Sequence, residues 1–205
     1  MVNYLYVNDL PDSLDFGSSV AVDTEAMGLN NRRDRLCLAQ FSDGNGDAHL
    51  VKFDGSNYSA PNIKKMLADD SIEKIFHYAR FDMAILQFYL QVKVRNVYCT
   101  KIASRIARTY SASHSLKELC SDLLSLKLNK QYGCSDWGGK ELSKEQINYA
   151  AGDVLHLHAI RDELNILLKR ERRNEIAINC FKFLNTRVDL DLMGWENCDI
   201  FNYES

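Results

Sequence analysis

The sequence predicts an α/β fold, with a mixed sheet of about five strands flanked by helices and a C-terminal half that is mainly helical. Two observations lead to this prediction. Short runs of β-branched and aromatic residues, separated by turn formers, occupy residues 1–60. From residue 61 onward, segments with apolar residues at helical spacing alternate with two more short strands. The rest of the chain has helical spacing only.

The composition indicates a single domain over residues 1–205. The chain is 46% hydrophobic, which suffices for one substantial core, and it contains two prolines and no low-complexity tract that would suggest a flexible linker. We expect neither a signal peptide nor a membrane span, because no apolar run approaches the ~20 residues that a span needs. The six cysteines form no Cys-x-x-Cys pair, which excludes the usual zinc spacings and favours reduced thiols in the cytoplasm.

The strands of the N-terminal part form a predicted meander. Residues 1–17 predict a lead-in strand and a turn, and the apolar run at 19–22 is typical of a strand buried on both faces. Residues 36–41 and 48–51 follow as two strands, and the turn formers at 43–47 allow them to pair antiparallel.

Strands and helices then alternate. Residues 72–76 and 96–99 predict the fourth and fifth strands. Helices are predicted to begin at Pro61, after His77-Tyr78-Ala79, at an N-cap Thr100, and at the capping-box sequences of Ser115 and Ser143. The helix that follows Ser143 is predicted to run to about Arg173.

Two carboxylates follow the buried strand directly. Asp23 and Glu25 are separated by one residue, so they project from the same face of the strand. Like charges held this close repel and raise each other's pKa. A divalent cation such as Mg²⁺ or Mn²⁺ would remove the conflict, because it prefers hard carboxylate oxygens. The alternative is a strand that ends in a solvated acidic turn, and this stretch alone does not decide between the two.

Further acidic residues occur near helix ends and faces. Asp82 lies near the start of the helix after the fourth strand, where the helix dipole alone would favour an acid. Tyr149 and Asp153 are four residues apart and therefore neighbours on one helix face. Gly152 beside them costs ~1 kcal/mol relative to alanine in a helix, which suggests a close approach by another group. A Tyr–Asp pair satisfied at the edge of the core is the alternative.

Together these residues resemble the motifs of 3′-5′ exonucleases of the DEDD superfamily, in its tyrosine-bearing branch, which has a ribonuclease H-like fold. Asp23-Thr24-Glu25 matches the first motif, residues 77–82 match the second, and residues 149–154 match the third. Ser135-Asp136-Trp137 is similar to the ribonuclease D pattern upstream of the third motif. The resemblance extends from about Val20 to the C-terminus.

A closer resemblance is to the short nanoRNase C group of ribonuclease D relatives. It rests on Arg35-Leu36-Cys37, on residues 99–104 and on the tail at 190–195. Members of this group lack the helical accessory domains of full-length ribonuclease D, and the tail from about Asn174 is too short to supply one. Cys99 stands where many ribonuclease D sequences have aspartate, but this position is not a metal ligand in the family.

The resemblance implies hydrolysis of phosphodiester bonds with two divalent metal ions, Mg²⁺ or Mn²⁺. Ions ~3.5–4 Å apart can stabilise both the attacking and the leaving oxygen of an in-line displacement. The family role of Tyr149 is to orient the attacking water. An unperturbed tyrosine has a pKa of ~10, which favours this role over general-base action. Asp23 would be the bridging ligand. The implied ligands are Asp23, Glu25, Asp82 and Asp153.

Four more residues are candidates for substrate binding: Leu29, His77, Arg80 and Trp137. In related exonucleases the leucine at the position of Leu29 wedges between terminal bases, and a turn residue that packs on the core is the equal alternative. His77 and Arg80 flank the second motif and could contact the scissile phosphate. Trp137 precedes the catalytic helix as a candidate stacking platform or lid residue.

The predicted function is that of a 3′-5′ exoribonuclease that releases nucleoside 5′-monophosphates from short RNA, down to dinucleotides. The net charge of −3 becomes +1 once the four site carboxylates are neutralised, which argues against a grip on long duplexes by counterion release. Trimming of longer RNA 3′ ends or of single-stranded DNA is the runner-up, and a non-catalytic nucleic-acid-binding scaffold is the rival class. The resemblance also implies a homo-oligomeric ring, such as an octamer, in which the tail at 174–205 forms an interface or folds onto its own domain.

Overall fold

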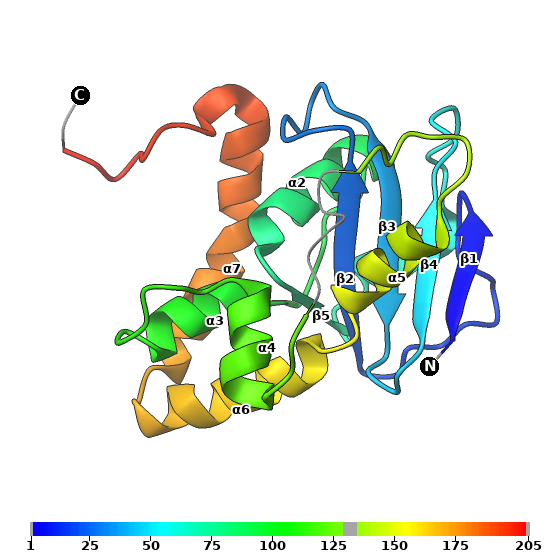
Figure 1. The fold of residues 1–205 in the computed structure, drawn as a ribbon. Helices are drawn as coiled ribbons and strands as arrows, with labels where there is room; N and C mark the ends of the chain where they lie inside the picture. The colour runs from blue at the N-terminus through cyan, green and yellow to red at the C-terminus, as the bar shows by residue number, and fades with distance from the viewer. Residues whose placement is uncertain (1, 129–134, 204–205) are drawn as a thin grey trace.

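A mixed six-stranded sheet forms the centre of the computed structural model, which describes residues 2–128 and 135–203. Its strand order is β1-β4-β3-β2-β5-β6, as Figure 1 shows for the first five of these strands. The strands are β1 (Asn3–Val7), β2 (Ser19–Ala26), β3 (Leu36–Ser42), β4 (Ala48–Lys52), β5 (Glu73–Phe76) and β6 (Val97–Cys99). The predicted mixed sheet is confirmed, and the lead-in segment is its sixth strand, because it pairs parallel to β4 at the edge.

Strand β2 lies inside the sheet with a partner on each side. It pairs antiparallel with β3 and parallel with β5, and its residues Val20, Ala21 and Val22 are fully buried. The register shifts between Glu25 and Ala26, so regular pairing ends just after the acidic pair. An irregularity of this kind lets a strand leave the sheet and redirect its side chains.

Helices cover both faces of the sheet and form a cluster at one end. The helices are α1 (Pro61–Ala68), α2 (Ala79–Leu90), α3 (Thr100–Ala107), α4 (Leu116–Leu124), α5 (Lys144–Gly152), α6 (Leu157–Arg170), α7 (Asn174–Leu190) and the π-helical turn η1 (Asp191–Trp195). Helix α5 crosses one face of the sheet and α2 packs on the other, while α3, α4, α6 and α7 gather beyond β5 (Figure 1).

Two of the predicted helix starts have the expected caps and one does not. Ser143 and Gln146 form a complete capping box, and the Ser115 side chain accepts a hydrogen bond from the Glu118 N–H. The prediction that Thr100 is an N-cap is wrong, because Cys99 occupies that position. The Thr100 hydroxyl is fully buried and donates to the Phe76 carbonyl of β5 instead.

The predicted long helix from Ser143 to about Arg173 is also wrong, because it is two helices. Helix α5 ends at Gly152, and α6 begins at Leu157. The N–H groups of Asp153 and Val154 each bond to the carbonyl three residues earlier, which tightens the last turn of α5. The chain changes direction at this turn, and Asp153 becomes the C-cap of α5.

Two further observations concern the described part of the chain. Five cysteines lie in it and none of them forms a disulfide there, and Cys134 lies outside the described residues. No helix in the ranges that the structure describes is long and apolar enough to cross a membrane.

Candidate active site

Three carboxylates from two elements meet at one place. Asp23 and Glu25 share a face of β2, and Asp153 comes from the end of α5, which crosses that face. One oxygen of each carboxylate lies within 4.8 Å of the others. The alternative of a solvated acidic turn does not fit this arrangement, because a third acid lies against the predicted pair.

Asp82 binds a side chain that projects from the opposite face of β2. It lies in the first turn of α2, only 3% exposed, and its Oδ1 accepts a hydrogen bond of 2.6 Å from the Thr24 hydroxyl. Thr24 lies between Asp23 and Glu25 and therefore points to the other face of β2. Sequence reasoning missed this residue, although strand alternation alone places it toward a helix on that face.

The four acids form an electrostatic cluster. Burial and the charge of Asp153 raise the pKa of Asp82 to about 7, against the lowering effect of the Thr24 hydrogen bond. Burial, followed by the charges of Asp153 and Asp82, raises the pKa of Glu25 to about 9. The pKa of Asp23 is also raised, by burial and then by Asp82, Asp153 and Glu25. These carboxylates are therefore costly to ionise together without a positive partner.

A divalent cation fits this group of side chains. All charges that raise these three pKa values are negative, and no lysine or arginine of the described residues is among the causes. Asp153 adds to the imbalance because it stands at the C-terminal end of α5, where the helix dipole disfavours negative charge. Hard carboxylate oxygens at this spacing are the ligands that Mg²⁺ and Mn²⁺ prefer.

Tyr149 lies one helical turn before Asp153 and extends the site. Its pKa is raised by burial, by the charges of Asp153, Glu25 and Asp23, and by a side-chain hydrogen bond with Asp153. The phenol therefore keeps its proton near neutral pH and acts as a hydrogen-bond donor. The predicted neighbourhood of Tyr149 and Asp153 is present, and it belongs to the carboxylate cluster rather than to a separate pair at the edge of the core.

The ring of Trp137 packs against the ring of Tyr149. The two rings are 6.1 Å apart between centroids, and Trp137 is only 2% exposed, so in this structure its indole faces Tyr149 and not solvent. Two hydrogen bonds connect the loop around Trp137 to the rest of the domain. Arg35 donates to the Gly138 carbonyl at 2.9 Å, and Lys52 donates to the Gly139 carbonyl at 2.6 Å. The stacking or lid role predicted for Trp137 stays a prediction.

Leu29 is the candidate that solvent reaches most easily. Its side chain is 87% exposed in the turn after β2. It lines a pocket of about 550 Å³ together with Arg32, Arg33, Tyr78 and Arg80. A leucine this exposed does not pack on the core, so the alternative of a core-packing turn residue does not hold in this structure.

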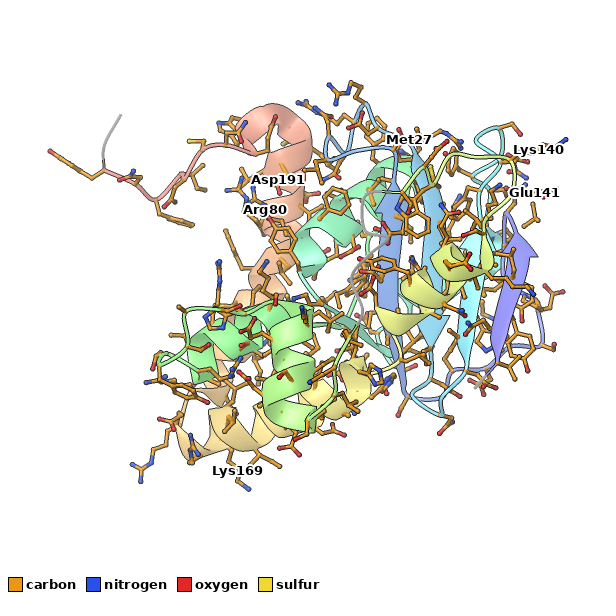
Figure 2. All side chains as sticks on the ribbon, viewed as in Figure 1. Met27, Arg80, Lys140, Glu141, Lys169 and Asp191 are labelled. Atoms are coloured by element: carbon orange, nitrogen blue, oxygen red, sulfur yellow. The ribbon has the colours of Figure 1, made fainter. Side chains whose placement is uncertain are left out.

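His77 and Arg80 are both engaged by neighbours in the protein. The Thr100 hydroxyl donates to the Phe76 carbonyl, so His77 Nδ1 must be the donor in its 2.9 Å hydrogen bond with Thr100. Arg80 makes two hydrogen bonds to the Asp191 carboxylate, at 2.6 and 2.8 Å, and Figure 2 shows the two residues side by side. Sequence reasoning missed Asp191, because nothing local connects residues that are 111 positions apart.

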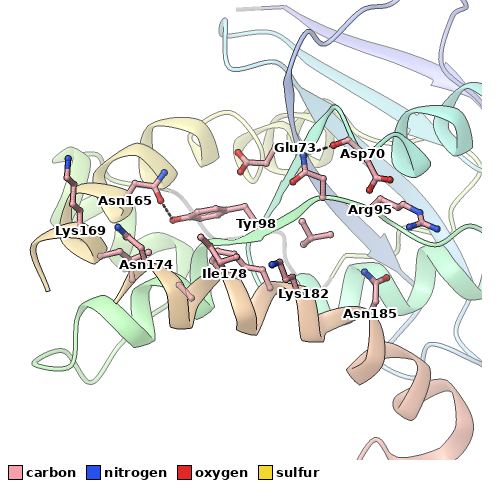
Figure 3. Close-up of a pocket in the computed structure, with 15 residues that line it drawn as sticks. Asp70, Glu73, Arg95, Tyr98, Asn165, Lys169, Asn174, Ile178, Lys182 and Asn185 are labelled. Carbon is pink, nitrogen blue, oxygen red and sulfur yellow. Dashed lines mark hydrogen bonds between the residues drawn. The ribbon is translucent and has the colours of Figure 1, made fainter. Parts of the chain in front are cut away.

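A second pocket lies away from the carboxylates. It measures about 840 Å³ and lies between the β6 edge and helices α6 and α7, where Tyr98 donates a hydrogen bond to Asn165 (Figure 3). Its lining mixes acidic Asp70 and Glu73 with basic Lys169 and Lys182. None of the predicted site residues lines this pocket. The candidate active site is therefore at the carboxylates, although this pocket has a large volume.

Comparisons with known proteins agree with the geometry. Residues 7–169 match the family model described as 3′-5′ exonuclease. The structure of Brucella melitensis NrnC is 46% identical, with a TM-score of 0.96 over 99% of this chain and 100% of that chain. NrnC has also been solved with bound Mg²⁺ and bound to pGG.

Ribonuclease D proteins are more distant relatives. The chain is 28% identical to ribonuclease D of Acidiphilium cryptum over 164 residues, which cover 80% of this chain and 41% of that protein. The chain thus spans less than half the length of the curated relatives it matches. The structure of Escherichia coli RNase D shares the fold, with a TM-score of 0.74 at 21% identity. The predicted ribonuclease H-like fold and the predicted family are confirmed.

The raised pKa values predict that replacing Glu25 by glutamine stabilises the metal-free protein, and more so at high pH. The unfolded glutamic acid ionises near pH 4.5, whereas the folded one keeps its proton up to about pH 9. Wild-type stability is therefore lost as pH rises through this window. In the presence of a chelator, Glu25→Gln should melt several degrees above the wild type at pH 8, with a smaller difference at pH 5.

The control is Glu163→Gln, which changes an exposed acid on α6. It should melt like the wild type at both pH values. Equal melting temperatures of Glu25→Gln and the wild type at pH 8 would show that the cluster is not electrostatically strained.

Proposed function

The chain belongs to the 3′-5′ exonuclease family, and from this premise we propose that it hydrolyses short oligoribonucleotides from the 3′ end, down to dinucleotides, releasing nucleoside 5′-monophosphates. The observation that carries this proposal is the meeting of Asp23, Glu25 and Asp153 within 4.8 Å, with Asp82 close enough to raise the pKa of both β2 acids. Acids gathered this closely are unfavourable for the fold itself, so a function has to account for them.

The proposed cofactors are two divalent metal ions, Mg²⁺ or Mn²⁺, held by the four carboxylates. When bound, such ions lower the pKa of a water and stabilise the charge that develops on phosphorus oxygens. Asp23 is the proposed bridging ligand, because its pKa responds to all three other acids. The Mg²⁺-bound structure of NrnC supports the use of a divalent cation.

Tyr149 and Thr24 have positioning roles in this proposal. The protonated phenol of Tyr149 donates its one hydrogen to Asp153, so its oxygen is left to accept a hydrogen bond from the attacking water and can thereby hold that water in line with the phosphorus atom. Its ring is kept in place by Trp137, and its hydroxyl by Asp153. Thr24 occupies one oxygen of Asp82, which fixes the orientation of that carboxylate.

The preference for short RNA is the finer part of the proposal. NrnC, which matches this chain over its whole length, has been solved bound to pGG. Leu29 is exposed at a pocket that also contains Arg32 and Arg33, as contact with a base and a phosphate would require. His77 and Arg80 are the proposed phosphate contacts, and Arg80 would have to exchange its bond to Asp191 for one to the substrate.

Trimming of longer RNA 3′ ends, or of single-stranded DNA, is the second candidate. It is favoured by the similarity to ribonuclease D. A non-catalytic nucleic-acid-binding scaffold is disfavoured, because every carboxylate and the tyrosine of the three motifs are present.

We also propose that residues 174–203 are part of the exonuclease domain and contribute to a homo-oligomeric ring. Helix α7 packs against α2 and α3, so the segment folds onto the same unit. Its end nevertheless exposes Met193, Trp195, Phe201 and Tyr203. Apolar side chains gathered at the surface in this way are typical of an interaction site.

The length preference is tested with 5′-labelled RNAs from the dinucleotide upward, in the presence of Mg²⁺. We expect the dinucleotide to be cleaved fastest and Asp82→Ala to be inactive, because the variant lacks one of the proposed ligands. Glu163→Ala, an exposed acid on α6, should cleave like the wild type. Equal rates on longer RNAs would favour the ribonuclease D-type role, and inactivity of the wild type would favour the scaffold.

Replacing Tyr149 by phenylalanine separates metal binding from turnover. The variant keeps the ring that packs on Trp137 and loses only the hydroxyl, so Mn²⁺ affinity measured by calorimetry should stay within about two-fold of the wild type. The turnover number should fall by about 10²-fold, the loss expected when the attacking water is misplaced by about 1 Å. Tyr110→Phe is the matched control at an exposed tyrosine outside the site and the tail, and near-wild-type turnover of Tyr149→Phe would contradict the assigned role.

The ring is tested by the mass of the protein in solution. Light scattering should give several times the 23.5 kDa of one chain, with eight chains as the expected size. Phe201→Ser should lower that mass, because it removes an exposed apolar side chain of the tail. A monomeric mass of the wild type would refute the ring.

A further inference from the structure

Gln40 is a polar residue in a strand that is otherwise nearly all apolar. All seven residues of β3 are buried, and Gln40 is 0% exposed. Neither its Oε1 nor its Nε2 has a hydrogen-bond partner among the described residues. Each buried polar group left in this state costs about 1–3 kcal/mol, so a leucine or methionine would suit the fold better.

Gln40 lies directly beside the carboxylate cluster. It is the cross-strand partner of Asp23 in the antiparallel pair of β2 and β3. Residues opposite each other in such a pair project from the same face, with Cβ atoms about 4.5–5.5 Å apart. The amide of Gln40 therefore lies on the face of the sheet that carries Asp23 and Glu25, within reach of the Asp23 carboxylate directly or through one water.

The other neighbours of Gln40 within the sheet are apolar or already engaged. On β4, the partner of Gln40 is Leu50, and along β3 the adjacent positions on the same face are Leu38 and Ser42. The Ser42 hydroxyl is already engaged, because it donates to the Asp47 carbonyl and accepts from the Gly44 N–H. Asp23 is therefore the polar neighbour of Gln40 within the sheet.

We propose that Gln40 is a positioning residue, whose amide Nε2 donates a hydrogen bond to the Asp23 carboxylate, directly or through one ordered water, when the site holds its cations. This inference rests on the proposed function. A carboxylate that binds a metal through one oxygen is oriented by hydrogen bonds to the other, and such supporting groups typically change metal affinity or activity by 10–100-fold. Gln40 is suited to this role because its amide is committed to nothing else in the described structure.

The test variant is Gln40→Met, which keeps an unbranched side chain of similar length and removes the amide. In chelator, it should melt at the same temperature as the wild type or higher, because an unpartnered buried amide is lost. Its affinity for Mn²⁺, measured by calorimetry, should weaken by about 10–100-fold. The turnover number on a dinucleotide should fall, with KM within about two-fold.

Ser42→Ala is the matched control. Ser42 lies two residues along the same strand and on the same face, but its hydroxyl is partnered away from the site. This variant should lose stability and keep the Mn²⁺ affinity of the wild type. Gln40→Met is thus expected to weaken Mn²⁺ binding without a loss of stability. Ser42→Ala is expected to lose stability without weaker Mn²⁺ binding.

Wild-type Mn²⁺ affinity and turnover in Gln40→Met would overturn the proposal, and so would a loss of stability with unchanged affinity. If Gln40→Met does not fold, Gln40→Leu replaces it, and failure of both to fold would show that the amide serves the fold alone. The proposed function is judged separately on the wild type and Asp23→Ala. If the wild type binds no Mn²⁺, the proposed function fails whatever Gln40 does.

Discussion

The mutual repulsion of the carboxylates at the end of β2 is the constraint on which the rest of the structure depends. One oxygen of each of Asp23, Glu25 and Asp153 lies within 4.8 Å of the others, and burial makes the charges of Asp23 and Glu25 more costly. A strand at the edge of a sheet could relax such a cluster by moving away. Strand β2 is fixed on both sides by β3 and β5, and its residues 20–22 are fully buried. The core of the sheet thus supplies the rigidity that holds like charges together.

One strand connects helices on opposite faces of the sheet to the same site. Asp23 and Glu25 project toward α5, which delivers Tyr149 and Asp153, whereas Thr24 projects toward α2 and binds Asp82. The period of two along a strand is therefore what brings the second motif and the third motif together. The break after Gly152 completes this geometry, because Asp153 leaves the helix where α5 ends. A continuous helix to residue 173 would have carried the chain past this point without a turn.

Local pattern predicted the parts of this site that depend on local geometry. Alternation along a strand sufficed to pair Asp23 with Glu25, and the four-residue helical spacing sufficed for Tyr149 and Asp153. The bond from Thr24 to Asp82 and the pairing of Arg80 with Asp191 join segments 58 and 111 residues apart, and no periodicity encodes them. The Thr100 cap failed for the same reason, because a buried contact with Phe76 of β5 outweighed a local preference. The roles proposed for these residues come from family resemblance, because pattern alone left them open.

The tail folds onto its own domain and still exposes apolar side chains, so the two roles that the sequence presented as alternatives are compatible. Asp191 is 7% exposed and binds both Arg80 and Arg187, and these two guanidinium groups also bind the carbonyls of Glu196 and Cys198. Gly194, with a φ of 109°, makes the turn that brings these carbonyls back to the arginines. The polar side of the segment is thereby satisfied within its own domain, while Met193 and Phe201 stay exposed. A surface that is already ordered loses little conformational entropy on association. Folding of the tail onto its own domain therefore favours an interface and does not compete with it.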